Sequence, residues 1–199
     1  MCYHTKITKN KEEMERHFHA RASGMDRFVP GSVFKAFDFP MTPVITKEDP
    51  GIIQLYQWGL LPHWADSSWN RNYTLNARVE TLEKKSAFRS AADNRCLVIV
   101  DGFYEWQHQG KDRVRYEVGF GDSLFALAGL YDHCEDKKTY VIVTTEAKGI
   151  MWEIHNSKRR MPMAMRNSNL MAAWLKGEMV EPEYDFSTSP PFHAQQALF

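Results

Sequence analysis

The chain has 199 residues, of which 43% are hydrophobic and 25% charged, as expected for one globular domain with a sizeable core. Its 25 basic and 25 acidic residues cancel, which excludes a strongly basic nucleic-acid-binding domain and leaves only a local basic patch for such a partner. Three cysteines without a C-x-x-C pair argue against a disulfide framework, and the lack of a signal-like start or long apolar run predicts a cytoplasmic protein.

Hydrophobic patterning predicts many short strands and few helices. Strands are expected at residues 3–8, 44–45, 52–58, 96–100, 114–120, 124–131 and 140–144. Helices are expected at 11–22, 86–92, 148–154 and 170–175, and loops at 34–43 and 65–73. Because most strands follow one another directly, we predict a single α+β domain over 1–199, with a mixed or antiparallel barrel-like sheet and short peripheral helices. The Pro- and Ser-rich tail from about residue 181 is expected to be less ordered.

The start of the chain carries unusual chemistry. If Met1 is removed, Cys2 gains a free amine beside its thiol. An α-amino group has a pKa of roughly 7.7–8.0, so part of it is neutral and nucleophilic near neutrality. Such an aminothiol can form an imine with an aldehyde through its nitrogen and then close a thiazolidine ring through its sulfur. The alternative is an ordinary second residue on a frayed terminus.

Further polar residues lie beside apolar or aromatic stretches. Glu105 stands between two aromatic residues, where desolvation would raise its pKa into the range of a general acid or base. Asn76 and Arg78 would share one side of an extended chain, so that the amide could hold a hydroxyl or carbonyl and the guanidinium a phosphate. His155 precedes a basic run and could donate a proton to a leaving oxygen. The plainer alternatives are an exposed Glu, a turn Asn with a solvated Arg, and a solvated basic loop.

Basic residues gather in two stretches, 71–95 and 158–160, and the aromatic residues Trp69, Tyr73 and Phe88 accompany the first. Positive charge with interleaved aromatics is typical of a groove for single-stranded nucleic acid. The alternative is that the same aromatic side chains are buried in the hydrophobic core. No phosphate-binding loop or zinc motif is present, and adjacent His133 and Cys134 lack a second ligand pair. No metal or cofactor is therefore predicted.

Taken in order, these segments resemble the SOS-response-associated peptidase (SRAP) family of abasic-site processing proteins. The matching pieces cover most of the chain and are Met1-Cys2, WGLLPHW at 58–64, NARVET at 76–81, Phe88-Arg89, RCL at 95–97, GFYEW at 102–106, LAGL at 127–130, Thr144-Thr145, Ile154-His155 and RMP at 160–162. The resemblance implies a DNA-damage enzyme that removes its own Met1. Cys2 would then capture the ring-opened aldehyde of an abasic site in single-stranded DNA as a thiazolidine crosslink, with an abasic-site lyase side reaction through the imine.

The resemblance also implies roles for individual residues. Asn76 would position the opened sugar, Arg78 would hold a phosphate, and Glu105 and His155 would shuttle protons. The further residues expected to contact DNA are Trp69, Arg71, Arg89 and Arg160. A monomeric bacterial protein of the cytoplasm is expected, associated with the nucleoid when DNA is damaged, without metal, cofactor or membrane.

Two segments depart from the family pattern. Tyr3-His4 follow Cys2 where the family commonly has Gly-Arg, so the phosphate contact of that arginine is not carried over. The family's His-x-Arg-Met-Pro is extended here to residues 155–162, with the histidine role assigned to His155. Two rival functions are a thiol peptidase that acts on other proteins, with His155 or Glu105 as base, and a noncovalent single-strand binding module. The neutral net charge weighs against the second rival, which would depend on electrostatics alone.

Overall fold

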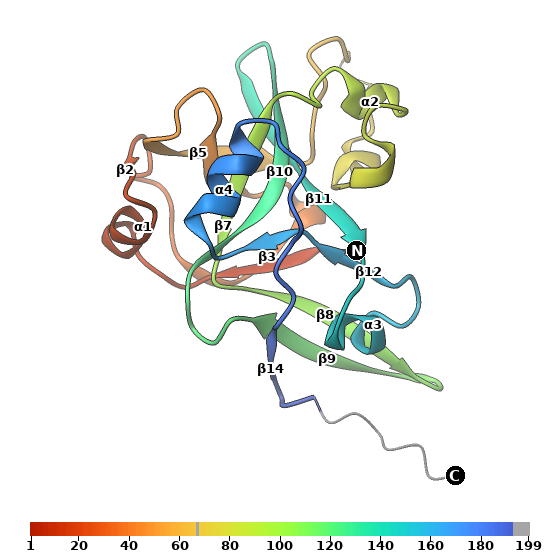
Figure 1. Cartoon of the computed structure of the whole chain (residues 1–199). Helices are drawn as coiled ribbons and strands as arrows, with labels where there is room; N and C mark the ends of the chain where they lie inside the picture. The colour runs from red at the N-terminus through yellow and green to blue at the C-terminus, as the bar shows by residue number, and fades with distance from the viewer. Residues whose placement is uncertain (67, 193–199) are drawn as a thin grey trace.

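A closed barrel of five strands forms the centre of the computed structural model, which describes residues 1–66 and 68–192 (Figure 1). The barrel strands, in spatial order, are β11 (Lys137–Glu146), β10 (Phe125–Cys134), β7 (Arg95–Val100), β4 (Met41–Thr46) and β5 (Ile52–Trp58). Neighbours in this order are antiparallel, and the barrel closes because β5 also pairs with β11 in parallel, with Tyr140 opposite Trp58. Short strands extend it: β2 (Arg21–Ala22) on β5, β6 (Asn76–Arg78) and β12 (Arg160–Pro162) on β11, and β13 (Ala164–Met165) on β10.

A second, antiparallel sheet continues directly from the barrel. Its order is β14 (Ser187–Ser189), β9 (Asp112–Gly119), β8 (Gly102–Gln109), β1 (His4–Ile7) and β3 (Gly31–Lys35). β7 runs into β8 through the buried Asp101, whose Oδ2 accepts hydrogen bonds from the backbone and hydroxyl of Thr8 at 2.6 and 2.5 Å. This corner fixes the N-terminal strand β1 beside β8.

The helices are short and peripheral (Figure 1). They are α1 (Lys11–Phe18), α2 (Ser86–Arg89), α3 (Ile150–Ile154) and α4 (Ser168–Leu175), with single 3₁₀ turns η1 (Ala36–Asp38), η2 (Arg71–Thr74) and η3 (Val79–Thr81). α1 begins at a capping box in which Asn10 and Glu13 satisfy each other's backbone N–H groups at 2.8 and 2.9 Å. Across residues 1–66 and 68–192, we find no helix with the length and apolar character needed to cross a membrane.

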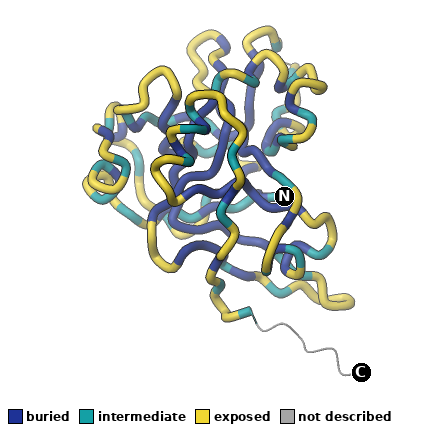
Figure 2. Tube along the Cα trace, in the orientation of Figure 1, coloured by how far each residue is buried: buried dark blue, intermediate teal, exposed yellow. Residues whose placement is uncertain are grey.

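The core fills the barrel and the space between barrel and second sheet (Figure 2). Every residue of β7 is buried, and so is all of β10 except His133, as expected for strands covered on both faces. Trp58 and Tyr140 stack with ring centroids 6.1 Å apart, and each polar tip is satisfied: Trp58 Nε1 donates to Leu75 O at 2.9 Å, and the Tyr140 hydroxyl bonds Thr42 Oγ1 at 2.6 Å.

The predicted fold class is confirmed: the chain is a single α+β domain with a mixed barrel and few short helices. The strand at 52–58 is also correct, whereas the helix at 11–22 stops at Phe18 because His19 turns into the left-handed region with φ of 51°. The predicted loop at 34–43 contains the end of β3, η1 and the start of β4, and strand β8 was not predicted.

The tail from residue 181 has a defined conformation as far as residue 192. Phe186 is buried, and Ser187 to Ser189 pair with β9 as β14. Residues 193–199 lie outside the described part of the chain.

Gly129 lets two barrel strands approach closely. A Cβ at this position of β10 would lie 2.8 Å from Cys96 Sγ and 3.1 Å from the Val141 carbonyl oxygen. We expect Gly129→Ala to lower the free energy of unfolding by about 1–3 kcal/mol, since backbone and buried sulfur cannot move aside cheaply. Denaturant unfolding would measure it against Gly51→Ala, where no atom lies within 4 Å of the added carbon. Equal stability of the two variants would contradict this account of the packing.

Candidate functional site

The N-terminal amine lies between a histidine and a glutamate. Met1 N is 2.7 Å from His155 Nε2 and 3.4 Å from Glu105 Oε1, and His155 Nε2 lies 3.9 Å from Glu105 Oε2. Glu105 is 4% exposed and His155 6%. A carboxylate, an imidazole and an amine from three distant parts of the sequence therefore form one group, which we call the amine cluster. Its Glu105 and His155 side chains are buried, and Met1 is partly exposed.

Barrel and second sheet each supply part of the amine cluster. Glu105 lies on β8, which pairs with β1 and so lies beside the N-terminus, while His155 ends α3. Asn76 begins β6 on the outside of β11, and its Nδ2 donates to the Cys2 carbonyl oxygen at 2.8 Å. Ala77 points into the core, so Asn76 and Arg78 share the other side, as the alternation of a strand predicts.

Burial sets the protonation of Glu105. Desolvation raises the pKa of this carboxyl from 4.5 to about 7, although the positive charge of the nearby amine opposes the shift. Its Oε1 is buried and has no hydrogen-bond partner among the described residues, the amine at 3.4 Å being an ion-pair contact only. Glu105 can therefore either hold or release a proton near neutrality, as the sequence predicts for a general acid or base.

His155 is neutral in this setting. Burial, followed by the nearby amine, lowers the pKa of its imidazole from 6.5 to about 4. Its Nδ1 lies 2.8 Å from the carbonyl oxygen and 3.0 Å from the backbone N of Arg160. When the proton is on Nδ1, the ring donates to the Arg160 carbonyl oxygen, and Nε2 is free to accept a hydrogen bond from the Met1 amine. When the proton is on Nε2, Nδ1 accepts a hydrogen bond from the Arg160 backbone N–H. The backbone of Arg160 can thus form a hydrogen bond with either neutral tautomer of His155.

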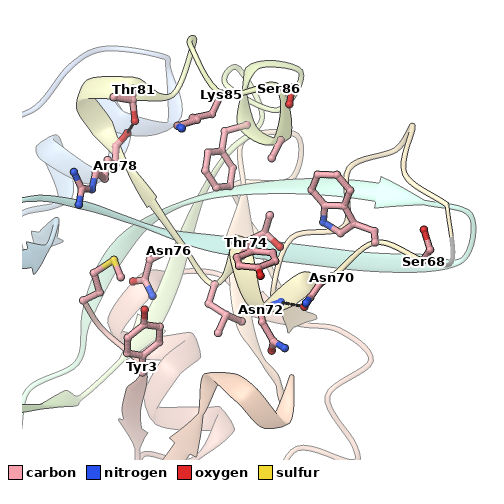
Figure 3. Close-up of a pocket in the computed structure, with 16 residues that line it drawn as sticks. Tyr3, Ser68, Asn70, Asn72, Thr74, Asn76, Arg78, Thr81, Lys85 and Ser86 are labelled. Carbon is pink, nitrogen blue, oxygen red and sulfur yellow. Dashed lines mark hydrogen bonds between the residues drawn. The ribbon is translucent and has the colours of Figure 1, made fainter.

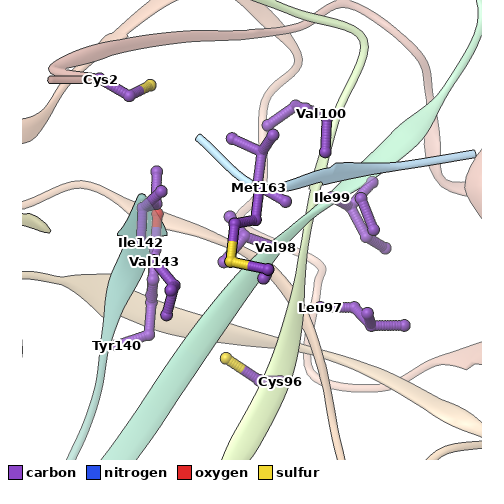
Figure 4. Close-up of a cluster of buried hydrophobic side chains, with 14 of the residues drawn as sticks. Cys2, Cys96, Leu97, Val98, Ile99, Val100, Tyr140, Ile142, Val143 and Met163 are labelled. Atoms are coloured by element: carbon purple, nitrogen blue, oxygen red, sulfur yellow. The ribbon is translucent and has the colours of Figure 1, made fainter. Parts of the chain in front are cut away.

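The thiol of Cys2 is covered. Cys2 is 0% exposed, and its Sγ donates to the His4 carbonyl oxygen at 3.9 Å. Burial, with a smaller effect of the Glu105 charge, raises the pKa of the thiol well above its ordinary value. Figure 4 places Cys2 and Cys96 at opposite ends of the buried cluster. A neutral, covered thiol does not favour a peptidase that uses Cys2 directly as a thiolate nucleophile while Met1 is present.

A groove of about 650 Å³ opens beside the amine cluster (Figure 3). Its lining includes four aromatic residues, two cations and several amides and hydroxyls: Tyr3, Trp69, Tyr73, Phe88, Arg78, Lys85, Asn70, Asn72, Asn76, Thr74, Thr81, Ser68 and Ser86. Among the described residues that line it, none is acidic. Although the protein is neutral overall, this groove carries net positive charge and aromatic faces, the composition that the sequence predicts for a single-strand groove.

Two of the arginines predicted to contact DNA are engaged within the protein. Arg71 donates to the carbonyl oxygens of residues 58 and 59 and to Gln57 at 2.7–3.0 Å. Arg160 forms a bidentate pair with Glu80 at 2.7 and 2.9 Å and donates to the Thr144 carbonyl oxygen at 2.7 Å. Their contact with DNA stays a prediction, while their guanidinium groups hold local structure in the isolated protein.

Of the other three residues predicted to contact DNA, two line the groove and one does not. Trp69 and Arg78 line the groove, and the buried Trp69 Nε1 has no hydrogen-bond partner among the described residues. Arg89 is exposed but does not belong to the lining. Sequence reasoning missed Tyr3 and Lys85, which also line the groove, because nothing in the local pattern separates them from core and surface residues. Within residues 1–66 and 68–192, no three His, Cys, Asp or Glu side chains are grouped so as to hold a metal.

The raised pKa of Glu105 predicts how stability changes with pH. The folded carboxyl binds its proton more tightly than the unfolded one, so its contribution to stability falls as pH rises from 4.5 through about 7. We expect Glu105→Gln to increase the free energy of unfolding by about 1–3 kcal/mol at pH 8 and to make little difference below pH 4.5. Denaturant unfolding at both pH values would measure this, with the exposed Glu83→Gln as control. A gain of equal size at both pH values, or a loss at pH 8, would contradict it.

Comparisons with known proteins agree with the architecture. A solved protein of Bacteroides thetaiotaomicron superposes with a TM-score of 0.81 at 28% identity, covering 90% of this chain and 83% of that one. "Abasic site processing protein YoqW" of Bacillus subtilis is 34% identical over 146 residues, 69% of this chain and 63% of that protein. "Abasic site processing protein HMCES" of Xenopus tropicalis is 28% identical over 153 residues, 62% and 45% of the two chains.

This chain therefore spans less than two thirds of the length of these named relatives. The sequence profile of the family described as "SOS response associated peptidase (SRAP)" matches residues 1–197, so the expected resemblance is confirmed. The chain belongs to the SRAP family.

Proposed function

We propose that this protein processes abasic sites in single-stranded DNA and captures them covalently through Cys2 after loss of Met1. The observation that carries the proposal is the amine cluster, in which the N-terminal amine lies between Glu105 and His155 beside an aromatic, cationic groove. The names of the relatives, abasic site processing proteins, support the same substrate.

Removal of Met1 is the first step of the proposed function. It is a hydrolysis: water adds to the Met1 carbonyl carbon, the Met1–Cys2 peptide bond breaks, and the nitrogen of Cys2 takes a proton. Glu105 and His155 hold the free amine of Met1, which is the feature that an aminopeptidase-like cleavage must recognise. Asn76 holds the Cys2 carbonyl oxygen at 2.8 Å, which fixes the following residue during the cleavage.

Capture of the aldehyde follows from the groups that remain. Loss of Met1 frees the space between Glu105 and His155 for the ring-opened sugar. The amine of Cys2 attacks the aldehyde carbon, and one of its protons moves to the oxygen to give a carbinolamine. Protonated Glu105 gives its proton to the departing hydroxyl, so that water leaves and a protonated imine forms. The sulfur then bonds to the same carbon, and its proton returns to the Glu105 carboxylate as the thiazolidine forms. The alternative fate of the imine, β-elimination of the phosphate, would be the lyase side reaction.

The groove suits the strand on which the aldehyde is carried. Arg78 and Lys85 can neutralise phosphates, while Trp69, Tyr73 and Phe88 offer faces for bases. Asn76 Oδ1 is buried without a hydrogen-bond partner among the described residues and could accept a sugar hydroxyl. Weak initial binding is sufficient, because the covalent bond keeps the strand once it has formed.

A denaturing gel with intact mass spectrometry tests the proposal. Protein lacking Met1 is mixed with a single-stranded oligonucleotide that carries one abasic site. We expect a heat-stable adduct whose mass is the sum of both molecules minus one water. The adduct should be absent with Cys2→Ala, with an acetylated N-terminus and with intact DNA, and present with Cys96→Ala, which removes another buried thiol.

Each outcome of this experiment separates the rival functions. No adduct from correctly processed protein would overturn the proposal. Cleavage of unrelated peptides by protein with a blocked amine would favour the thiol peptidase. Equal affinity for intact and lesioned DNA, unchanged by Cys2→Ala, would favour the noncovalent binding module.

Salt dependence tests the cationic lining. If Arg78 contacts one phosphate, Arg78→Ala should slow adduct formation at low salt by about threefold to tenfold. It should also reduce the slope of log rate against log salt concentration by about 0.7, the value for one contact with a single strand. The matched control is Lys111→Ala in the turn between β8 and β9, outside the groove lining. An unchanged slope for Arg78→Ala would contradict the phosphate contact.

A further inference from the structure

An aromatic pair stands beside the reacting end of the chain. Tyr3 directly follows Cys2 and lines the groove, where Figure 3 shows it next to Asn76. Its ring stacks on that of Phe37, with centroids 5.2 Å apart and an angle of 29° between the planes. Phe37 is 54% exposed, so the core does not account for its side chain. The two rings thus form a stacked pair in which Tyr3 lines the groove and Phe37 is exposed to solvent.

The backbone holds this pair rigidly. Ala36 donates its N–H to the Tyr3 carbonyl oxygen at 2.9 Å, and β1 pairs with β3 immediately before η1. The turn is closed by the N–H of Phe39, which donates to Ala36 O at 3.1 Å. Ala36 itself is fully buried. Tyr3 and Phe37 therefore meet through fixed backbone contacts, and their stacking needs little ordering when a ligand arrives.

We propose that Tyr3 and Phe37 form a stacking subsite for the nucleobase adjacent to the abasic position. This inference rests on the proposed function and names how the same site would recognise its substrate. A base next to an abasic position has lost its stacking neighbour on one face, so an aromatic surface in the protein can replace that neighbour. The Cα of Tyr3 is about 3.8 Å from that of Cys2, so a nucleotide bonded to the captured sugar lies within reach of the ring.

The chemistry of the subsite favours a base over a phosphate or an ion. In the sequence, Phe37 is flanked by an exposed cation, Lys35, and an exposed anion, Asp38, whose formal charges cancel. Flat aromatic faces stack on any base, which suits a lesion that can arise in any sequence. The subsite would thus recognise that a base is present beside the lesion and would tolerate its identity.

Rates of adduct formation on paired oligonucleotides test the subsite. One oligonucleotide carries a normal base beside the abasic site, and in its partners a stable baseless spacer without an aldehyde replaces the neighbour on the 5′ or the 3′ side. With processed wild-type protein we expect the base-flanked substrate to react about tenfold faster than one of the two spacer substrates. Tyr3→Leu and Phe37→Leu should reduce this ratio to about one, whereas Tyr3→Phe should keep it.

The ratio cancels any general loss of activity. Tyr184→Leu, at a side chain 41% exposed and outside the groove lining, is the control that should retain the ratio. A ratio near one for the wild type, or a full ratio in both leucine variants, would overturn the subsite while leaving the proposed function intact. Absence of any adduct from the wild type would instead overturn the proposed function, so the two failures are distinguishable.

Discussion

The contact on which the site depends joins a buried carboxylate, a neutral imidazole and an N-terminal amine. A carboxylate taken out of water is costly unless it is paired or protonated, and Glu105 resolves this by a pKa of about 7. His155, buried beside it, stays neutral with a pKa of about 4. The site can therefore hold a proton donor and a proton acceptor at one amine near neutrality, an arrangement that water would not permit for ordinary Glu and His side chains.

The barrel topology creates this contact from distant segments. The start of β11 closes the barrel on β5, and its later half carries β6 in parallel and β12 antiparallel. Thr144 on β11 links the two outer strands, because its hydroxyl donates to Ala77 O at 3.1 Å and its carbonyl accepts from Arg160 at 2.7 Å. Strand β11 thus fixes the positions of Asn76 and of the Arg160 backbone, which forms hydrogen bonds with His155. The second sheet places Glu105 and the N-terminus beside them.

Much of this could be predicted from sequence, and the failures have physical causes. The apolar runs at 52–58 and 96–100 predict strands, and both are strands of the barrel. The ordered family motifs indicate Cys2, Asn76, Glu105 and His155 as site residues. By contrast, Arg160 pairs with Glu80, 80 residues away in the chain, and only the fold reveals that its charge is neutralised. Tyr3 looks like a core aromatic until its partner Phe37 is known. The low pKa of His155 likewise follows first from burial and a nearby amine, and the charge of Arg160 in the basic run has a smaller effect.

The most direct test of this account is an NMR titration of the protein with its Met1 amine in place. The side-chain carboxyl carbon of Glu105 and the ring of His155 would be followed from about pH 3 to pH 9. We predict that the carboxyl titrates near pH 7 and that the imidazole stays neutral down to about pH 4. Midpoints at the ordinary values of 4.5 and 6.5 would contradict the amine cluster on which the proposed chemistry rests.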